Sequence, residues 1–537
     1  MALEMRSYRP LNIGRRGAVA ANHPLATQAG LLALRAGGNA VDAAVATAVT
    51  LSVVEPMMSG LGGDGFYHVY EQATGRAVVF NGTGPAPAAA SPERYAGGIP
   101  RIGPLSVSVP GTLVGLDAMH KSFGRLPWRD LFAEAIAFAG GGFGATRSYC
   151  HFAEEYRTTL AADPRSAAIF LHKGSPPPLG APIVQPALAR TLEEIAADGA
   201  DSFYRGRLAR RLAAGLEAAG SLVSAADLEA FEAEQQQPIG IDYRGYTVLE
   251  APPNSTGFVL LEELKILENF DLARMGLLSA DAVHLMVEAK KLAFADRERW
   301  AADPRSVQAP LAALLSADYA AQLAQRIDMR CAAPTRSPAA AAGDTTYFCT
   351  ADGEGNAVSG VQSINSGFGS GVIAGDTGIL LNNRMIYWHL EPGHPNRLKP
   401  GRRVRHTMNP PLVLKDGQLW CVFGTPGADN QVQINLQVLT AMIDFGLDPQ
   451  QAAEMPRWTS NVPGQYANWP HDGEDALTIE QRFPEAVRGE LARRGHPVRT
   501  VGDLDGPCSV EIIRRDLATG MLLAGSDPRR DGWALAW

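Results

Sequence analysis

Thr345 is the residue best placed to do chemistry, because it follows a run of small residues and begins a β-rich stretch, TTYFCTADGEGN. A threonine hydroxyl is a poor nucleophile until a base takes its proton, and one arrangement that works uses the α-amino group of the same residue. That amine has a reference pKa of about 8, so a useful fraction is neutral near neutral pH. Thr345 would carry a free amine only after the Asp344-Thr345 bond is cut, so this chemistry requires cleavage there.

The segment before Thr345 is suited to cleavage. Residues 329–344, MRCAAPTRSPAAAAGD, are mostly small, include prolines and match neither the helical nor the strand period, which is typical of an exposed linker. Taken alone the pattern is weak, because a Thr-Thr pair at the start of a strand is usually there for its β propensity. Residue patterns therefore leave both interpretations open.

Three other patterns could do chemistry, and each has a plainer interpretation. GLGGDG, residues 60–65, satisfies the G-x-G-x-x-G pattern of dinucleotide sites, but a helical stretch precedes it and a strand-like run follows, the reverse of the required order. HLEPGH, residues 389–394, offers two histidines without a third ligand at helical spacing, so no metal site is predicted. Cys349 follows Thr345 closely, but strand cysteines are usually buried small apolar groups.

The composition predicts a folded protein with a small-molecule partner. Of 537 residues, 46% are apolar and 19% charged, which is ordinary for a compact chain. The net charge of -8 comes without a long basic run, so neither nucleic-acid nor membrane binding is expected. The five scattered cysteines lack C-x-x-C spacing, and the N-terminus lacks the apolar stretch of a secretory signal, so a reducing, cytoplasmic location is expected.

Periodicity predicts layered α and β structure around a buried helix. The apolar residues 39–55 are too few for a bilayer span, and the Gly37-Gly38-Asn39 and Pro56 that flank them predict a helix buried between layers. Strand-like runs such as GFYHVYE and RAVVFNG follow, whereas residues 185–325 are predicted to be mainly helical. After residue 344, two pairs of β-rich runs surround DGEGN and KDG, so Thr345 is expected at the first residue of a strand.

Six separated stretches resemble the γ-glutamyltransferase family, in the same order along the chain. They are GGNAVDAAVATAVTLSVVEPMMSGLGGDGF, SVPGTLVGLDAMHKSFGRLPW, DYRGYTVLEAPPNSTG, VEAKKLAFADRERWAADP, DTTYFCTADGEGNAVSGVQSINSGFGSGVIAGDTGILLNNRM and GSDPRRDG. In that family the precursor is cut before a Thr, which then attacks a γ-amide. Six ordered motifs across almost the whole chain are far more specific than any one of them.

The resemblance implies an α+β protein with the four-layer αββα fold of N-terminal-nucleophile hydrolases, cut into a large piece, residues 1–344, and a small piece, residues 345–537. The two pieces would stay together as a heterodimer, with a dimer of heterodimers as a further possibility, and without cofactor or metal. By position, Thr345 is the nucleophile, Ser363 a hydroxyl residue hydrogen-bonded to it, and Asn365 a residue that helps hold the substrate. Polar filling of a Gly-rich strand end is the alternative for Ser363 and Asn365.

GTPGADNQ, residues 424–431, matches the family's Gly-rich turn, in which two consecutive backbone N-H groups form the oxyanion hole. The two positions here are Gly427 and Ala428. Backbone donors survive a change from Gly to Ala where the local φ angle accommodates a Cβ. One such donor contributes about 3 to 4 kcal/mol of transition-state stabilisation in known cases.

The chain departs from the family where the α-carboxylate and α-ammonium of a γ-glutamyl group are bound. The family's Arg, its ammonium-binding acid and its Ser-Ser pair correspond here to Asn81, Tyr387 and His406-Thr407. Loss of the acid and gain of Arg384 disfavour an α-ammonium, whereas Arg384 could clamp a carboxylate, with further hydrogen bonds from His406, Thr407 and Asn365. A structural salt bridge of Arg384 and a loop-filling His406 are the plainer alternative.

The sequence therefore predicts an autoprocessing amidohydrolase that acts on a small amide with a carboxylate and no α-amine, as the oxamate amidohydrolase and glutaryl or cephalosporin acylase branches of the family do. The short loop from His389 to Arg405 favours hydrolysis over transfer. Two alternatives remain, namely a γ-glutamyltransferase or glutathione hydrolase, and a non-catalytic scaffold that has kept the fold.

Overall fold

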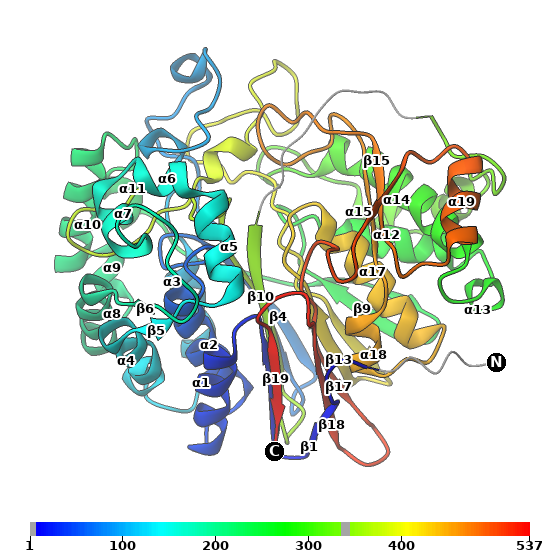
Figure 1. Cartoon of the computed structure of the whole chain (residues 1–537), viewed down its shortest axis with the longest axis horizontal. Helices are drawn as coiled ribbons and strands as arrows, with labels where there is room; N and C mark the ends of the chain where they lie inside the picture. The colour runs from blue at the N-terminus through cyan, green and yellow to red at the C-terminus, as the bar shows by residue number, and fades with distance from the viewer. Residues whose placement is uncertain (1–6, 335–343) are drawn as a thin grey trace.

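Two seven-stranded sheets lie face to face at the centre of the molecule, and helices cover the outer face of each (Figure 1). The computed structural model describes residues 7–334 and 344–537. The layers run helix, sheet, sheet, helix, which confirms the αββα fold expected from the resemblance. Among the described helices, none combines the length and the apolar character needed to cross a bilayer.

The first sheet carries Thr345 on a central strand. Its strands, in spatial order, are β19 (Trp533–Ala536), β2 (Gly17–Ala21), β10 (Asp344–Asp352), β11 (Ala357–Asn365), β3 (Asp64–Glu71), β4 (Arg76–Gly82) and β7 (Glu234–Gln236), and every neighbouring pair is antiparallel. Its outer face is covered by α1 (Pro24–Arg35), α2 (Ala40–Val54) and α3 (Thr112–Phe123). Farther out lie α4 (Ala133–Gly141), α8 (Pro186–Asp198) and α10 (Arg207–Ala219).

The second sheet is also antiparallel throughout. Its strands, in spatial order, are β1 (Asn12–Gly14), β18 (Leu522–Ser526), β17 (Glu511–Arg515), β13 (Gln418–Gly424), β12 (Leu412–Lys415), β9 (Tyr246–Glu250) and β8 (Ile239–Tyr243). Its outer layer contains α12 (Gly257–Leu267), α17 (Asn430–Ile443) and α18 (Pro449–Glu454), with α14 (Ala280–Trp300) packed on α12. A smaller sheet of β14 (Trp458–Asn461), β15 (Ala476–Glu480) and β16 (Val498–Val501) lies on the same side of the molecule.

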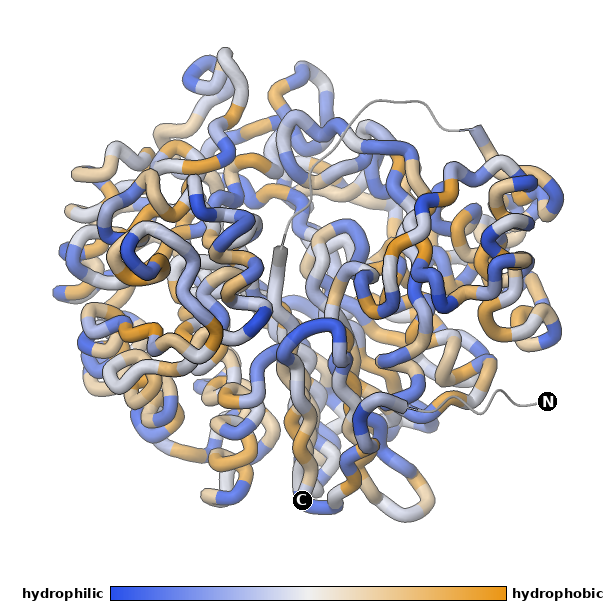
Figure 2. Tube along the Cα trace, viewed as in Figure 1, coloured by the Kyte–Doolittle hydropathy of each residue, from blue (hydrophilic) through white to orange (hydrophobic). Residues whose placement is uncertain are grey.

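The layer between the two sheets is filled by buried alanine, aliphatic and aromatic side chains. Ala18, Ala351, Tyr347, Leu412 and Ile513 belong to this cluster. The alanines let the facing strands approach closely, and the larger aliphatic and aromatic side chains fill the remaining volume. Figure 2 shows the apolar residues along the central strands and the inner helix surfaces, and the most hydrophilic stretches on the peripheral turns.

Helix α2 confirms the predicted buried helix and begins where the sequence indicates. The Asn39 side chain accepts from the backbone N-H groups of Val41 and Asp42, and the Asp42 carboxylate accepts in return from the Asn39 N-H. This reciprocal cap satisfies donors that a helix start leaves unpaired. All fifteen residues of α2 are buried between the first sheet and the outer helices, which explains the absence of a polar face.

The predicted hairpins also form. β10 and β11 pair across the DGEGN turn, and β12 and β13 pair across Asp416 and Gly417, whose φ angles are +51° and +71°. Two consecutive positive φ angles are typical of the tight hairpin turns that Asp-Gly favours. β10 begins at Asp344, so Thr345 is the second residue of the strand and not the first.

The middle section is mainly helical, as predicted, and departs from the prediction only at three short strands. Residues 234–250 form β7, β8 and β9, of which β7 is the edge of the first sheet and β9 pairs with β12. These strands are short and are defined by partners far away in the sequence, which a local period does not report. Most of the predicted linker, residues 335–343, lies outside the described residues.

Both sheets take strands from each side of the predicted cleavage point. In the first sheet β10 lies between β2 and β11, and in the second β12 lies between β9 and β13. Residues 1–344 and 345–537 therefore share two hydrogen-bonded sheets and one core, so a cut before Thr345 would leave the pieces bound to each other.

The carboxylate of Asp42 offers a test of this architecture. Besides the Asn39 N-H, it accepts from the backbone N-H groups of Arg125 and Leu126. Asp42→Ala would leave these donors without a partner, and we expect a loss of about 2 to 3 kcal/mol in the free energy of unfolding, measured by urea titration. Asp117→Ala, which removes a surface pair with Lys121, should cost less than about 1 kcal/mol. Equal losses in the two variants would contradict the role given to Asp42.

Candidate active site

Strand pairing brings Thr345, Ser363 and Asp64 to the same end of the first sheet. Ser363 pairs with Asp64 in the register between β11 and β3. On the other side, Asp344 pairs with Asn365 and Thr346 with Gln362, so Thr345 stands opposite two residues of β11 at a break in the register. Such irregularities re-aim a side chain, and they recur beside functional sites.

The Thr345 hydroxyl lies in a buried hydrogen-bond network. It donates to Ser363 Oγ at 3.3 Å, and the residue is only 2% exposed. Ser363 Oγ also accepts from Arg384 Nη2 at 2.9 Å and from the Asn365 N-H at 2.8 Å. In the uncut chain the nitrogen of Thr345 is a peptide amide within β10. The network therefore positions the hydroxyl before any amine is available.

Asp64 is the acid at the centre of this site, although in the sequence it is visible only as part of a glycine pattern. Its Oδ2 accepts from Arg384 Nε at 3.1 Å and lies 3.4 Å from His406 Nε2, while Oδ1 accepts from the Gly84 N-H at 2.8 Å. Burial by itself would raise the pKa of Asp64, but the hydrogen bond to His406 and the charge of Arg384 outweigh it and lower that pKa. Asp64 is therefore ionised and balances the charge of Arg384.

His406 is neutral at physiological pH. Burial, together with the charge of Arg384, lowers its pKa to about 4, although Asp64 acts in the opposite direction. Because the neighbour of Nε2 is a carboxylate, that nitrogen carries the proton and Nδ1 is an acceptor. Nδ1 is buried and has no hydrogen-bond partner in the described chain. The proton of His406 is therefore directed at Asp64, whereas the sequence argument had assigned it to a substrate.

Arg384 forms the structural salt bridge that sequence analysis had kept as the alternative. It is 1% exposed, pairs with Asp64, and also donates from Nη1 to Asn365 Oδ1 at 3.2 Å. Its guanidinium carbon lies 4.4 Å from the centre of the Tyr387 ring. Three of its five N-H groups thus have acceptors among the described residues, and its charge is compensated within the protein.

The remaining predicted substrate residues lie nearby and are paired with one another or with the backbone. Tyr387 and Thr407 share a hydrogen bond of 3.0 Å. Asn365 has a φ angle of +81° and donates to Asn383 O and to Asn468 Oδ1. Asn81 lies on β4, and its side chain donates a hydrogen bond to Asn254 Oδ1 at 2.9 Å. The backbone carbonyl of Asn254 accepts from the His406 N-H, so Asn254 links Asn81 to the site.

Gly427 and Ala428 form a turn between β13 and the start of α17. Their φ angles are +120° and +49°, and a Cβ on Gly427 would lie 2.2 Å from Cys508 Sγ, so that position requires glycine. Within the described residues neither backbone N-H donates to a protein acceptor. β13 faces β10, and Gly424 at its end lies against the ring of Tyr347, two residues beyond Thr345. Two amides at a helix start are suited to binding an oxyanion.

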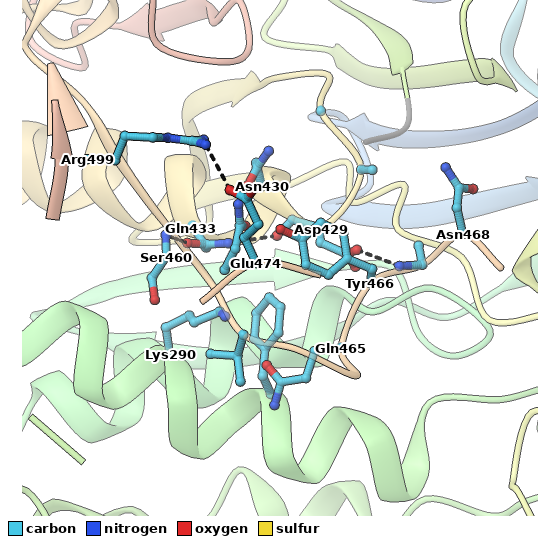
Figure 3. A pocket seen from close by; sticks show the side chains of 16 residues that line it. Lys290, Asp429, Asn430, Gln433, Ser460, Gln465, Tyr466, Asn468, Glu474 and Arg499 are labelled. Atoms are coloured by element: carbon cyan, nitrogen blue, oxygen red, sulfur yellow. Dashed lines mark hydrogen bonds and ion pairs between the residues drawn. The ribbon is translucent and has the colours of Figure 1, made fainter. Parts of the chain in front are cut away.

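A cavity of about 250 Å³ opens at this turn (Figure 3). Its wall combines the turn, the start of α17, one face of α14 and the segment 460–468, and its residues include Lys290, Phe294, Gly427, Ala428, Asp429, Ser460, Val462, Gln465, Tyr466 and Asn468. Thr345 and Arg384 do not line it. The hydrogen bond that the Asn365 side-chain amide donates to Asn468 Oδ1 connects the cavity wall to the network around Thr345.

The structure therefore divides the predicted residues into two adjoining groups. Ser363, Asn365 and Arg384 surround Thr345, whereas Gly427 and Ala428 belong to the cavity wall. Asp64, Asn468 and Lys290 were missed. Asp64 lies in the glycine pattern GLGGDG, and Lys290 lies in the family-like stretch VEAKKLAFADRERWAADP. Neither pattern indicates which charged side chains face the site in the folded protein.

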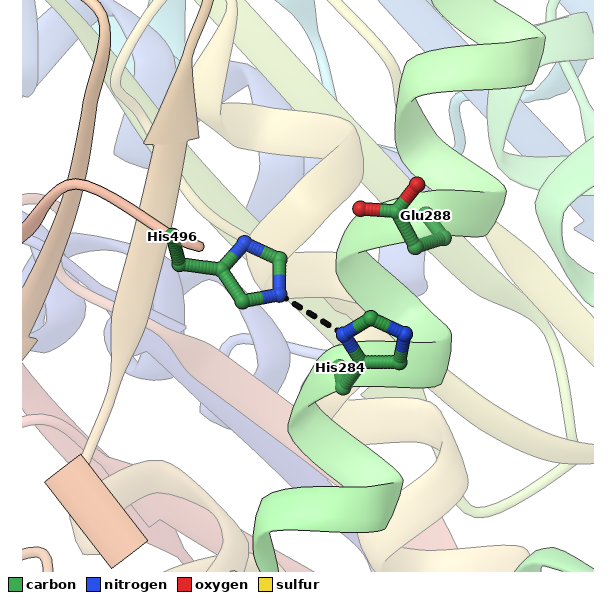
Figure 4. A group of neighbouring side chains, drawn as sticks. All are labelled: His284, Glu288 and His496. Carbon is green, nitrogen blue, oxygen red and sulfur yellow. Dashed lines mark hydrogen bonds between the residues drawn. The ribbon is translucent and has the colours of Figure 1, made fainter. Parts of the chain in front are cut away.

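A group of His284, Glu288 and His496 has ligand atoms close enough to hold a metal ion (Figure 4). His284 Nδ1 and His496 Nε2 lie 2.8 Å apart, which is a hydrogen-bond distance, and His284 Nε2 lies 2.9 Å from the Asp328 carbonyl. Glu288 accepts from Lys291 Nζ at 2.7 Å. These hydrogen bonds explain why the three residues lie close together: they link α14 to the small piece, which contributes His496.

A second group contains the two histidines of HLEPGH, and α14 supplies the third ligand that local spacing lacked. It consists of Glu298, His389 and His394. The two imidazole rings stack with their centroids 3.5 Å apart, and Glu298 accepts from Arg297 and from Arg405. The carboxylate is thus engaged by two cations.

The fold and the site define a class of protein. Two stacked antiparallel sheets between helical layers, with a threonine near the start of a central strand and free amides at a facing turn, are the arrangement of an N-terminal-nucleophile hydrolase. The chain belongs to the gamma-glutamyltranspeptidase family, whose model matches residues 26–537.

Relatives from this family span nearly the whole chain. A glutathione hydrolase-like proenzyme of Bacillus subtilis is 40% identical over 526 residues, which are 97% of this chain and 99% of the relative. An oxamate amidohydrolase proenzyme of Klebsiella pneumoniae is 36% identical over 541 residues, 98% of this chain and 99% of the relative. The crystal structure of a cephalosporin acylase from Bacillus halodurans has a TM-score of 0.91 and 36% identity, and covers 100% of this chain and 98% of that one. The chain is therefore an enzyme of the amidohydrolase and acylase type.

The turn at Gly427 and Ala428 can be tested by exchanging side chains at its two positions. Gly427→Ala forces a Cβ into Cys508 and displaces both amides, so kcat should fall about 100-fold or more. Ala428→Gly is the matched control, because glycine adopts the positive φ angle of this position without strain. The variant should retain activity, and its free energy of unfolding should rise by about 1 kcal/mol. Amide hydrolysis and urea titration measure the two effects, and equal activity in both variants would rule out the turn as a donor site.

Proposed function

We propose that this protein is an autoprocessing amidohydrolase in which Thr345, once it is the N-terminus of residues 345–537, attacks the amide bond of a small carboxylate-bearing substrate. The observation that carries the proposal is the Thr345 hydroxyl held by Ser363 near the start of β10. β10 faces β13, the strand that leads into the Gly427 turn, whose two amides have no acceptor among the described residues. The names of the relatives support processing, because those two chains are called proenzymes.

Processing and turnover use the same groups in succession. In the uncut chain the Thr345 oxygen attacks the carbonyl carbon of Asp344, the peptide C-N bond breaks, and the resulting ester is hydrolysed to leave a carboxylate and a free α-amine. That amine then takes the proton of the Thr345 hydroxyl as the oxygen attacks a substrate amide. The proton passes to the leaving amine, an ester with Thr345 remains, and water hydrolyses it to the acid.

The amides of Gly427 and Ala428 are the proposed donors to the tetrahedral oxyanion in both acyl-transfer steps. They are directed by the backbone and need no reorganisation as the charge develops. The hydroxyl of Ser363 is proposed to hold the Thr345 oxygen in position, and Arg384 and the Asn365 N-H hold Ser363 in turn. Arg384 is thus assigned a positioning role.

The charge balance supports a substrate with a carboxylate and without an α-amine. An α-ammonium needs a free acid, but the acids of the site already have cation partners: Asp64 pairs with Arg384, Asp429 with Arg297, and Glu474 with Arg499. Binding an ammonium at Asp64 or Asp429 would require breaking a buried pair, which is costly, whereas the Glu474 pair is exposed and lies at the rim. Hydrolysis of γ-glutamyl compounds is the second candidate, because one relative is named as glutathione hydrolase-like.

The nucleophile is tested by Thr345→Ala. This variant should remain a single chain of 57.1 kDa on a denaturing gel and hydrolyse no amide, because it lacks the hydroxyl for both steps. Thr345→Ser should split into two pieces and retain part of the activity. Cys349→Ala is the matched control on the same strand, and it should split and hydrolyse as the wild type does. Cleavage of Thr345→Ala at the same bond would show that another group cuts the chain.

The substrate class is tested with two anilides that differ by one group. Glutaryl and γ-glutamyl anilides have the same chain and terminal carboxylate, and only the second has an α-ammonium. We expect kcat/KM of the processed wild type to be at least about tenfold higher for the glutaryl compound, which corresponds to about 1.4 kcal/mol. Oxamate, assayed by ammonia release, tests a shorter acid. A tenfold preference for the γ-glutamyl compound would favour the second candidate.

A further inference from the structure

Lys290 is a buried cation in the wall of the cavity beside the Gly427 turn. It lies on α14, is 1% exposed, and its Nζ stands 3.9 Å from the centre of the Phe294 ring. Figure 3 shows the side chain projecting from the helix toward the segment that carries Ser460 and Gln465. A buried lysine normally faces an acid or a carbonyl, since an ammonium without acceptors is costly to desolvate.

Lys290 has no such partner within the protein. Across residues 7–334 and 344–537, no carboxylate oxygen lies within 4.0 Å of its Nζ, and no acceptor is hydrogen-bonded to it. The next residue differs, because Lys291 pairs with Glu288. The cations around the cavity differ as well, since Arg297 pairs with Asp429 and Arg499 with Glu474. Lys290 is therefore the uncompensated positive group of this wall.

The surroundings of Lys290 favour loss of the proton from its ammonium group. Burial, together with the charges of Arg297 and Lys291 on its own helix, lowers the pKa of Lys290 to about 7. Glu263 on α12 and Asp429 before α17 act in the opposite direction, and Asp475 in the neighbouring loop also responds to the charge of Lys290. An anion in the cavity would stabilise the charged form and offset its desolvation.

We propose that Lys290 binds a carboxylate of the amide substrate and so sets the preference of the enzyme for anionic substrates. The inference rests on the proposed hydrolase function and assigns the charge recognition to a residue other than Arg384. Gly427 and Ala428 line the same cavity as Lys290, so a substrate whose carbonyl is held at the turn can place its carboxylate at Lys290. Phe294 and Val462 line the wall and offer apolar contact to the hydrocarbon between the two groups.

The carboxylate can belong to the acyl group or to the amine that leaves, and two matched substrate pairs separate these sources. The acyl pair is glutaryl anilide and the anilide whose terminal carboxylate is replaced by a primary amide. The amine pair is the butyryl amide of 4-aminobenzoic acid and butyryl anilide. For each pair the measured quantity is the ratio of kcat/KM for the charged compound to kcat/KM for the neutral one, which cancels changes that affect both.

Lys290→Met removes the charge and keeps a side chain of similar length. We expect the ratio to fall about tenfold or more in one pair, and that pair identifies the end of the substrate that Lys290 binds. Lys290→Arg keeps a cation and should retain most of the ratio. Lys291→Met is the matched control on the same helix and should leave both ratios unchanged. Ratios within twofold of the wild type in both pairs for Lys290→Met would overturn the inference.

A pH profile of the wild type gives a readout that needs no variant. As the pH rises through about 7, the free enzyme loses the charge of Lys290, so KM for the charged compound should rise relative to KM for its neutral partner. Titration of the Thr345 amine affects both compounds and leaves that ratio unchanged. A flat ratio between pH 6 and 9 counts against Lys290. If the wild type hydrolyses these amides and Lys290→Met has the same charged-to-neutral kcat/KM ratio as the wild type, only this inference fails. If the processed wild type cleaves no compound of either pair, the proposed function fails as well.

Discussion

The antiparallel pairing of β10 with β11 and of β11 with β3 is the constraint on which the site depends. These two ladders place Thr345, Ser363 and Asp64 side by side at one end of the first sheet, and the break in register at Thr345 separates its side chain from the regular alternation. Strands buried in the middle of a sheet have little freedom to slip, because a shift of one residue would turn every side chain to the other face. The proposed nucleophile is therefore held by the rigid centre of the fold.

Because the two sheets are rigid, the fold can tolerate a break in the chain next to the site. The strands on either side of the predicted cleavage point are interleaved in both sheets, and the buried cluster between the sheets contains residues from both pieces. Scission at Asp344-Thr345 removes one covalent bond while the ladders, the core and links such as His284 to His496 remain. The new amine would thus appear at a place where its neighbours are already fixed.

Most buried positive charges in and around the site are compensated by a neighbouring acid. Arg384, Arg297 and Arg405 are all buried and all paired with acids, so they act as structural groups whose charges are largely cancelled. His406 stays neutral beside Arg384, and its proton is directed at Asp64. Among the described residues of the cavity wall, the cation without an acid partner is Lys290, which is therefore the group that an anion would meet.

Much of the fold was determined locally and is visible in the sequence. The cap at Asn39, the apolar run of α2 and the Asp416-Gly417 turn each specify their own element, because the interactions involve neighbours along the chain. The ordered motifs likewise pointed to Thr345, and the separate stretch GTPGADNQ pointed to the turn at Gly427. The short strands β7 to β9 were missed, because their pairing partners lie far away in the sequence and their own periodicity is weak.

The charges of the site were decided only by the tertiary structure. Asp64 and Arg384 are 320 positions apart, and no local pattern indicates that they form an ion pair, or that Lys290 is left without one. Residue type and spacing determine which groups a chain possesses and which elements carry them. The free energy of a buried charge depends on what lies within a few ångströms in space, and folding alone sets those neighbours.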